Sequence, residues 1–408
     1  MSNIKYKKFA DINLRDSFFD SLREDYPEFD TWYQKKAKAE ESAYVLYEEN
    51  KLVCFVYLKI ENSLDTNIIP PLYPTRWVKI GTFKIEARRT KLGQRFIKRA
   101  FDFAISHNIF DLYVTAYDKH IVLIDILKRY GFVEYGKKGN EKVLTKHIIS
   151  NNDLLTFSEV CGKLEQCPLL SKKFNNLPIS QKNVISRYRQ DLNFQLCCSK
   201  CDHFFHFYKS LELPDDLSFI FPTVSTRETK KYILSIYPEY HTRMFSDSKL
   251  HTESDSILCD ISESNSIHKV YLSAISDTQF LKRGDLLVIY RTKDKDAPSA
   301  NYSSVATSLC VVEEYRSIYS FEDEENFIKY CSPYNIFSTK ELKHYYETKR
   351  YPHIIKMTYN ISFNKRVVLD KLRKIIPNVS YWGFVALDIQ QFYQIIQEAE
   401  INDSIVVY

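Results

Sequence analysis

A cluster of basic residues with one glycine stands where a predicted strand passes into a predicted helix. Residues 85–100 read IEARRTKLGQRFIKRA, with Arg88, Arg89, Lys91 and Gly93 in the turn. Free N–H groups at a helix start attract phosphate oxygens, a glycine permits close approach, and neighbouring cations strengthen the attraction. The turn is a candidate pyrophosphate site, although a basic turn before a helix is also typical of a solvated surface.

Three residues near this turn are candidates for proton transfer. Tyr117 and His120 belong to the segment YDKH, which joins the next predicted strand to a helix. A histidine titrates near neutral pH and can act as a general acid or base. Glu86, at the end of the strand before the turn, is a further candidate base. The alternatives are that His120 caps its helix and that Glu86 only favours the helix dipole.

The elements that must position these residues follow from hydrophobic periodicity. Residues 42–60 predict two strands around a tight turn, and residues 77–85 and 111–117 predict two further strands. Apolar residues recur at helical spacing in residues 95–108 and in residues 121–130, where the helix is expected to end at Gly131. A final strand follows this glycine. The predicted order is strand, basic turn, helix, strand, helix, strand.

This order and the turn residues resemble the GNAT family of N-acetyltransferases over about residues 1–148. In that family an Arg/Gln-x-x-Gly-x-Gly/Ala turn opens the helix that binds the CoA pyrophosphate, and a Gly-Phe corner, here Gly131-Phe132, precedes a strand that completes the cleft. The resemblance implies an α/β GNAT fold, a mixed sheet with flanking helices, over residues 1–150. It also implies acetyl-CoA as the acyl donor. The implied cofactor-binding residues are Ile85, Arg88, Arg89, Lys91, Leu92, Gly93 and Gln94.

Two positions depart from the family pattern. Lys91 stands where the first glycine of the turn would be, and Leu127 stands where many members carry a tyrosine that protonates the CoA thiolate. Acyl-CoA binding is therefore a safer expectation than turnover. The candidate catalytic residues are His120, Glu86 and Tyr117. The alternative is a non-catalytic protein with a degenerate GNAT cleft, which senses acyl-CoA or binds nucleic acid.

The second half of the chain predicts a different domain. Residues 151–231 mix short helical patterns with loops and are treated as a connecting region, whereas residues 232–408 are rich in strands. The segment FLKRGDLLVIYRT around Gly284 and the strands near it resemble the PUA-like superfamily, particularly ASCH and EVE domains. The resemblance implies an α+β, partly closed barrel that binds RNA or modified DNA. The candidate nucleic-acid-binding residues are Arg283, Tyr290 and Arg291, with Tyr271 and Trp382 as further aromatic candidates.

No metal site is predicted. The segment CCSKCDHFFH contains Cys198, Cys201, His203 and His206. Zinc requires four ligands arranged as a tetrahedron, and the two pairs here are separated by a single residue. A buried aromatic element is the preferred interpretation.

Composition sets the remaining limits. A chain of 408 residues favours two or three domains, and 44% hydrophobic content argues against disorder. The net charge of +5 permits a nucleic-acid partner without requiring one. The nine cysteines are irregularly spaced and favour a reducing compartment. The apolar runs are far shorter than the roughly 20 residues that span a bilayer, and the first residues lack the apolar core of a signal peptide. A cytoplasmic protein is expected, with its oligomeric state open.

The leading hypothesis is an acetyl-CoA-dependent N-acetyltransferase joined to a PUA-like nucleic-acid reader. The reader would direct acetylation to an amine of RNA, of a modified base, or of an associated protein. In a further hypothesis the protein is also an N-acetyltransferase, but its substrate is a protein or a small amine and the second domain is an interaction platform.

Overall fold

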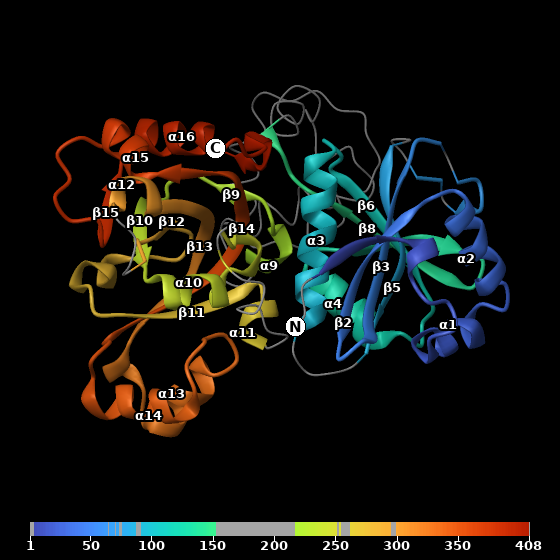
Figure 1. Ribbon diagram of the computed structural model, residues 1–408, viewed down its shortest axis with the longest axis horizontal. Helices are drawn as coiled ribbons and strands as arrows, with labels where there is room; N and C mark the ends of the chain where they lie inside the picture. Colours follow the sequence, from blue (N-terminus) through green and yellow to red (C-terminus); the bar gives the residue numbers. More distant parts are fainter. Residues whose placement is uncertain are drawn as a thin grey trace, which may run out of the picture.

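Two sheets, one in each half of the chain, form the framework of the protein (Figure 1). The computed structural model describes residues 4–63, 65–69, 71–72, 76–86, 91–151, 217–250, 253, 262–294 and 299–407. Arg88, Arg89, most of the predicted connecting region and the segment with Cys198, Cys201, His203 and His206 lie outside the described residues.

The first sheet has eight strands in the order β1-β2-β3-β5-β6-β8-β7-β4. Only β5 and β6 pair in parallel, and the other neighbours are antiparallel. The sheet is therefore mixed, as predicted. Its strands are β1 (Lys5–Lys8), β2 (Ser42–Glu48), β3 (Lys51–Glu61), β4 (Ile68–Ile69), β5 (Trp77–Ile85), β6 (Asp111–Ala116), β7 (Val133–Lys138) and β8 (Glu141–His147).

Helices cover both faces of this sheet: α1 (Asp20–Asp25), α2 (Phe29–Lys38), α3 (Leu92–Ser106) and α4 (Ile121–Arg129). Alternate residues of a strand point to opposite faces. Phe55 and Tyr57 of β3 pack with α2, whereas Val56 and Leu58 belong to the core that contains α3 and α4. The sequence thus builds two apolar layers, with α1 and α2 on one face and α3 and α4 on the other.

Helix α3 confirms the periodicity seen in the sequence. The apolar residues expected to face the sheet are all buried, namely Phe96, Ile97, Ala100, Phe101 and Ala104. The helix begins at Leu92 rather than Arg95, directly after the basic turn. Helix α4 ends before Gly131, whose φ of 82° lies in the left-handed region that glycine adopts without strain.

The second sheet has six strands in the order β11-β14-β13-β12-β10-β15. Strands β10 and β12 are parallel, and the other pairs are antiparallel. The expectation of mixed sheets with flanking helices is confirmed, but the described residues do not form a closed barrel, because β11 and β15 are the two edges of an open sheet. The strands are β10 (Lys231–Ile236), β11 (His268–Ser273), β12 (Leu286–Arg291), β13 (Val305–Ser317), β14 (His353–Val368) and β15 (Phe384–Leu387).

Short elements surround the second sheet and connect it to the first half of the chain. The pair β9 (Val224–Ser225) and β16 (Val406–Val407) joins the end of the chain to the residues that precede β10. The helices are α9 (Leu217–Ile220), α10 (Pro238–Met244), α11 (Ser262–Asn265), α12 (Ala300–Ser303), α13 (Glu324–Cys331), α14 (Thr339–Thr348), α15 (Leu369–Ile375) and α16 (Ile389–Glu398).

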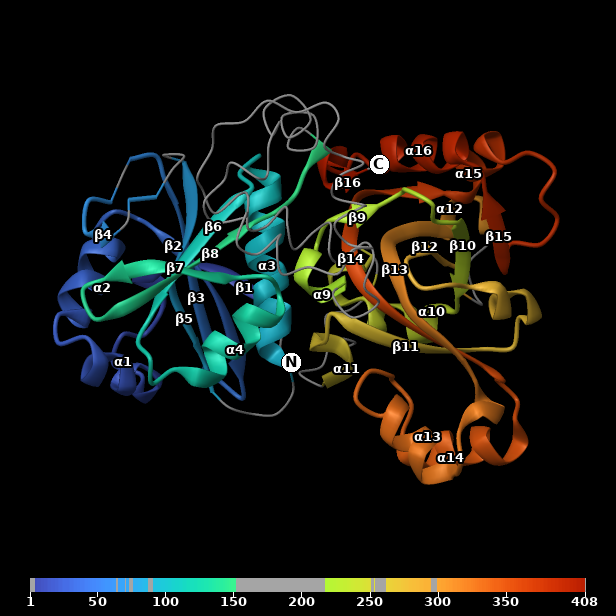
Figure 2. The ribbon, with the colours of Figure 1, turned by 180° about the vertical axis from the view of Figure 1, so that it is seen from behind.

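Helix α3 lies between the two sheets. It covers the first sheet with one side and faces the second domain with the other (Figures 1 and 2). One cluster of buried apolar side chains runs through both halves, from Phe96 and Phe101 of α3 to Phe221 and Phe392. The two halves therefore pack as one body rather than as independent modules.

Candidate active site

Strands β5 and β6 part toward their carboxyl ends. They pair over three residues only, from Val78 opposite Leu112 to Ile80 opposite Val114. Beyond this point β5 continues to Ile85 without pairing to β6. The exposure changes at the same place, because β5 is mostly buried before Gly81, exposed at Gly81 and half-buried after it. In open sheets, ligands bind beyond the carboxyl ends of neighbouring parallel strands.

A β-bulge marks the point where the strands part. Tyr57 of β3 opposes Thr82 and Leu58 opposes Ile80, so Gly81 is the extra residue. A bulge leaves its extra residue unpaired and redirects the backbone. A β-carbon at Gly81 would lie 2.7 Å from the ring of Tyr57, so only glycine fits without movement. Gly81 is exposed, and it has no partner residue in β3 or in β6.

The start of α3 follows β5 at the same edge of the sheet. The residue before the helix, Lys91, has a left-handed backbone with φ 54° and ψ 21°, and its side chain does not cap the helix. The first N–H groups of a helix have no partner within it and favour anions. The first turn of α3 is therefore the described part of the predicted phosphate-binding turn, and phosphate binding there stays a prediction.

Apolar residues pack closely behind this turn. Leu92 is 3% exposed and belongs to the core, and Ile85 packs against the same core. A β-carbon at Gly93 would lie 3.0 Å from Cδ1 of Ile126 in α4. Gly93 therefore lets α4 approach the first turn of α3, and Ile85 and Leu92 support the turn from the core side.

Two of the predicted cofactor-binding side chains are directed toward the second domain. The ammonium of Lys91 lies 3.6 Å from the centre of the Tyr334 ring. The side-chain carbonyl of Gln94 accepts hydrogen bonds from the Ser266 hydroxyl and the Ile267 N–H, at 2.9 and 3.0 Å. Because these two side chains are directed toward the second domain, it is the backbone at Lys91 and Gln94 that remains for the cleft.

The structure brings Tyr117 and His120 together at the end of α1. His120 Nε2 lies 3.1 Å from Oδ2 of Asp25, and the ring centres of Tyr117 and Tyr26 are 5.3 Å apart. A carboxylate bonded to one imidazole nitrogen fixes the orientation and the tautomer of the ring. Strand and helix patterns did not reveal Asp25 and Tyr26 as partners, because both lie at the end of α1, far earlier in the chain.

Glu86 lies at the same edge of the sheet as Tyr117. It directly follows β5, and its N–H donates to the carbonyl of Val53 at 3.0 Å. Because β5 and β6 are parallel, the residues that follow them come out at one edge. The side chain of Glu86 is exposed.

A carboxylate beside the bulge was not predicted from the sequence. The hydroxyl of Tyr57, whose ring covers Gly81, donates to Glu41, and Lys36 donates to the same carboxylate at 2.9 Å. Burial by itself raises the pKa of Glu41, but the hydrogen bonds from Tyr57 and Lys36 outweigh it and lower the pKa. The glycine within a strand was the available signal, because glycine there often marks a bulge; nothing in the sequence connected it to Glu41.

Leu127, which stands where many GNAT members carry a tyrosine, is a core residue. Leu127 is 1% exposed and packs in the main core. The neighbouring Tyr130 is fully buried, and its hydroxyl lies 3.1 Å from His268 Nε2 of the second domain. Neither side chain is presented to the cleft as a proton donor.

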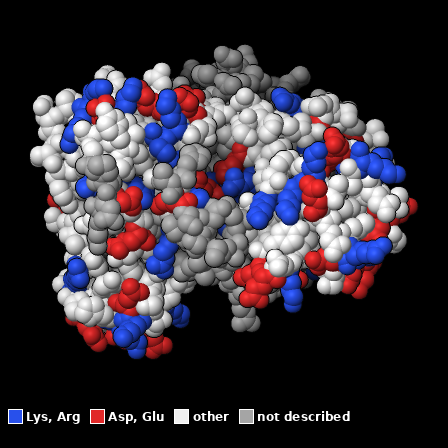
Figure 3. Space-filling model, viewed as in Figure 1, with Lys and Arg blue, Asp and Glu red and all other residues white. Residues whose placement is uncertain are grey.

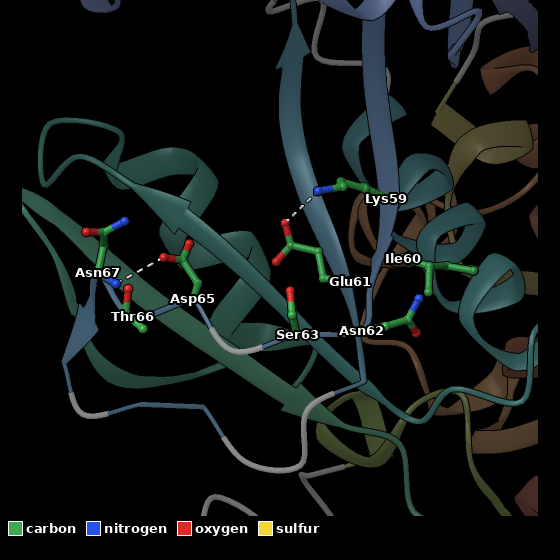
Figure 4. A pocket seen from close by; sticks show the side chains of 8 residues that line it. All are labelled: Lys59, Ile60, Glu61, Asn62, Ser63, Asp65, Thr66 and Asn67. Carbon is green, nitrogen blue, oxygen red and sulfur yellow. Dashed lines mark hydrogen bonds and ion pairs between the residues drawn. The ribbon is translucent and has the colours of Figure 1, made fainter.

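A separate hollow lies at the opposite edge of the first sheet (Figure 4). It has a volume of about 560 Å³ and is lined by the end of β3 and the loop after it. Glu61 in this hollow pairs with Trp77 at the beginning of β5, whereas the cleft opens at the end of β5. Its two carboxylates are already bonded, Glu61 to Lys59 and Asp65 to Lys138. The hollow is therefore not part of the candidate active site.

The candidate nucleic-acid residues divide into buried and exposed ones. Tyr290 and Arg291 are 3% and 2% exposed, and Arg291 pairs with Glu253 and Asp294 at 3.0 and 2.8 Å. Burial keeps the Tyr290 ring from stacking on a base, and the Arg291 charge is neutralised inside the domain. Arg283 is exposed. On the face shown in Figure 3, basic and acidic side chains are interspersed over both domains.

Two polar side chains between Ser235 and Leu250 are enclosed by the fold. His241 is fully buried, and its Nε2 lies 2.8 Å from the Thr307 hydroxyl. Asp247 pairs with Arg99 of α3 at 2.7 Å. Burial alone raises the pKa of Asp247, but Arg99 and Lys98 outweigh it and lower the pKa to about 2.

The described residues contain no group of three or more His, Cys, Asp or Glu side chains that could hold a metal ion. In the part of the chain that the structure describes, no helix is both long and apolar enough to cross a membrane.

No protein-family model and no curated protein matches the chain. Solved structures resemble parts of it. ASCH from Zymomonas mobilis is 11% identical, and the match covers 41% of this chain and 94% of that one, with a TM-score of 0.28. A predicted acetyltransferase from Clostridium acetobutylicum, solved with acetyl-CoA, is 18% identical and covers 33% and 92%, with a TM-score of 0.27. A GNAT family acetyltransferase from Elizabethkingia anophelis, solved with acetyl-CoA, is 12% identical and covers 36% and 97%, with a TM-score of 0.27. At these identities and TM-scores the similarity assigns neither a family nor an activity to the chain.

Proposed function

We propose that the protein is an N-acetyltransferase of the GNAT type that binds acetyl-CoA between β5 and β6. The observation that carries this proposal is the parting of the two parallel strands at the Gly81 bulge. It leaves the stretch of β5 from Gly81 to Ile85 without pairing to β6, and α3 begins at Leu92 a few residues later in the chain. An extended chain can add to such an edge through backbone hydrogen bonds, and a phosphate group can bind at the helix start.

The turn residues Arg88, Arg89 and Gly93 would hold the pyrophosphate, supported by the first N–H groups of α3. The exposed backbone at Gly81 would donate to the thioester oxygen, where negative charge develops during attack. Both groups lie along one strand and the turn that follows it. A ligand with a phosphate at one end and a thioester at the other fits this arrangement.

The proposed reaction forms a C–N bond to the acceptor amine and breaks the C–S bond of the thioester. His120, oriented by Asp25, accepts the proton that the amine loses. Tyr117 donates a proton to the departing thiolate. Glu86 and Glu41 are the other carboxylates near the cleft, and each is an alternative base.

Calorimetric titration of the full chain with acetyl-CoA tests the binding step. We expect one site per chain, and we expect the double change Arg88→Ala, Arg89→Ala to weaken binding by about tenfold or more, because each charge-assisted phosphate contact contributes about 1.5–3 kcal/mol. Lys340→Ala, an exposed cation of α14, is the matched control and should bind as the wild type does. Absence of heat with the wild type would contradict the proposal.

Thiol release during incubation with amines separates an enzyme from a sensor of acyl-CoA. Binding without thiol release from protein, peptide, small-amine or nucleic-acid acceptors would favour the non-catalytic alternative. We assign no nucleic-acid acceptor, because two of the three residues predicted to contact one, Tyr290 and Arg291, are buried.

A further inference from the structure

Helix α3 buries polar side chains as well as apolar ones. Gln94, Arg95 and Lys98 are 4%, 4% and 2% exposed. Buried polar groups require hydrogen-bond partners, and several of these come from the second domain. Arg95 donates to Asn265, Gln94 accepts from Ser266 and Ile267, and the Lys98 ammonium lies 4.7 Å from the centre of the Tyr359 ring. The contacts reach the first turn of the helix.

The backbone just before this turn is strained. Lys91 has φ 54° and ψ 21°, the left-handed conformation that costs energy for a residue with a β-carbon and that glycine adopts freely. Such conformations persist where the surroundings fix them. The turn between strand and helix therefore needs a source of restraint at Lys91.

The restraint comes from the loop after α13 in the second domain. The Lys91 ammonium donates to the carbonyl of Pro333 and lies 3.6 Å from the centre of the Tyr334 ring. Tyr334 is itself fixed, because its N–H donates to Cys331 and its carbonyl accepts from Val270, at 3.0 and 2.9 Å. A carbonyl and an aromatic face together form a favourable site for an ammonium.

We propose that the second domain forms the acetyl-CoA turn of the first domain by anchoring Lys91 and Gln94. Tyr334 is in this account a positioning residue: it touches no substrate and acts through Lys91. The inference rests on the proposed function, since it concerns the same turn. It gives the second domain an indirect part in binding acetyl-CoA, and it predicts that a change that separates the two domains lowers the affinity for acetyl-CoA.

A double-mutant cycle on the full chain tests this, with the dissociation constant for acetyl-CoA from calorimetry as the readout. Tyr334→Leu removes the aromatic face and should raise the constant about fivefold or more, the lower end of typical coupling between sites. Tyr334→Phe retains the aromatic face and should bind acetyl-CoA with the affinity of the wild type. In the background Lys91→Gly, Tyr334→Leu should have no further effect, because glycine needs no anchor.

Two additional variants guard against a trivial result. Tyr319→Leu, the same change at a tyrosine that is 70% exposed in the same domain, should bind acetyl-CoA as the wild type does. Ser266→Ala removes one donor to Gln94 and should also raise the constant, which provides a milder variant of the same contact. Thermal unfolding of each variant checks that the protein is folded.

The outcomes separate the inference from the function. A wild type that binds acetyl-CoA with the same affinity as Tyr334→Leu and Ser266→Ala overturns the inference and leaves the function standing. An equal effect of Tyr334→Leu in the Lys91→Gly background also overturns it, because Tyr334 would then act by another route. A wild type that does not bind acetyl-CoA contradicts the proposed function and the inference with it.

Discussion

At the scale of single residues, the proposed acetyl transfer depends on side chains that lie at one edge of the first sheet, where β5 and β6 end. The sequence identified Tyr117, His120 and Glu86 as candidates, and the topology places them where parallel strands end. It did not identify Asp25, which pairs with His120, because no periodic pattern links a short helix near residue 20 to a loop near residue 120. Substitutions at His120 and at Gly81 test this arrangement.

His120→Gln should lower kcat by about 10²–10⁴-fold, the usual contribution of a general acid or base. Glutamine keeps a hydrogen-bond donor toward Asp25 but cannot accept a proton. Steady-state thiol release measures the effect, and calorimetry checks that acetyl-CoA still binds. Asp25→Asn should also lower kcat, because an amide does not hold the orientation and tautomer of the ring as the carboxylate does. Unchanged kcat in His120→Gln would exclude His120 as the base and turn attention to Glu86 and Glu41.

Gly81→Val should weaken both acetyl-CoA binding and turnover. The added β-carbon would meet the ring of Tyr57 at 2.7 Å, so the bulge or the ring must move. Gly139→Asn is a suitable control, because nothing lies within 4 Å of a β-carbon there and asparagine tolerates its positive φ. Calorimetry and thiol release on both variants provide the comparison. If Gly81→Val retains wild-type affinity, the bulge does not contact the ligand.

At the scale of elements, α3 shows what the sequence reveals and what it hides. The apolar period predicted Phe96, Ile97, Ala100, Phe101 and Ala104 as the core side, and all are buried. The polar side looks like a solvated face in sequence, yet it is buried against partners far along the chain, such as Asp247 opposite Arg99. Periodicity reports which side packs on a sheet, but it cannot report that a second domain covers the other side.

The Asp247–Arg99 contact should make stability depend on pH. The pKa of Asp247 is about 2 in the folded protein and about 3.9 when unfolded. The folded value is the lower one, so the contribution is fully present above about pH 4 and is lost as the pH falls toward 2. It amounts to about 3 kcal/mol. Urea unfolding at pH 3 and pH 6 should show a larger loss for the wild type than for Asp247→Asn, and equal losses would contradict this.

A buried lysine of β8 should destabilise the folded protein, and the size of this cost should also depend on pH. Burial lowers the pKa of Lys146 to about 7, below its unfolded value, so between about pH 7 and pH 10 the unfolded chain binds more protons and stability rises with pH. Lys146→Met removes the buried amine and should stabilise the protein by a few kcal/mol at pH 6, with a smaller gain at pH 9. Urea unfolding at both pH values measures the difference. A destabilised variant at pH 6 would mean that the bond from Lys146 to the Phe219 carbonyl outweighs the cost of burial.

At the scale of the whole molecule, the two domains behave as one body in this account. Alternation and helical spacing predicted the individual strands and helices, and the resemblance to the GNAT family implied the mixed sheet with flanking helices. A closed barrel is not formed by the described residues, because the second sheet keeps β11 and β15 as open edges. The cleft itself depends on which residues of β5 and β6 pair, and strand register is not encoded in the pattern of a single strand. The contact between Lys91 and Pro333 joins residues 242 positions apart, beyond the reach of any local pattern.

One cooperative thermal transition is expected for the full chain. A single apolar cluster runs through both domains, and α3 contributes to both interfaces, so neither domain can unfold while the other keeps its core. Differential scanning calorimetry should show one peak whose calorimetric and van't Hoff enthalpies agree. Two resolved peaks would mean that the domains fold independently.

The most direct test of the central claim is a crystal structure of the full chain with acetyl-CoA. The account predicts that the ligand lies between β5 and β6, with its thioester oxygen at the backbone of Gly81 and its pyrophosphate at the first turn of α3. Acetyl-CoA bound elsewhere, or a cleft that stays closed at saturating acetyl-CoA, would contradict it.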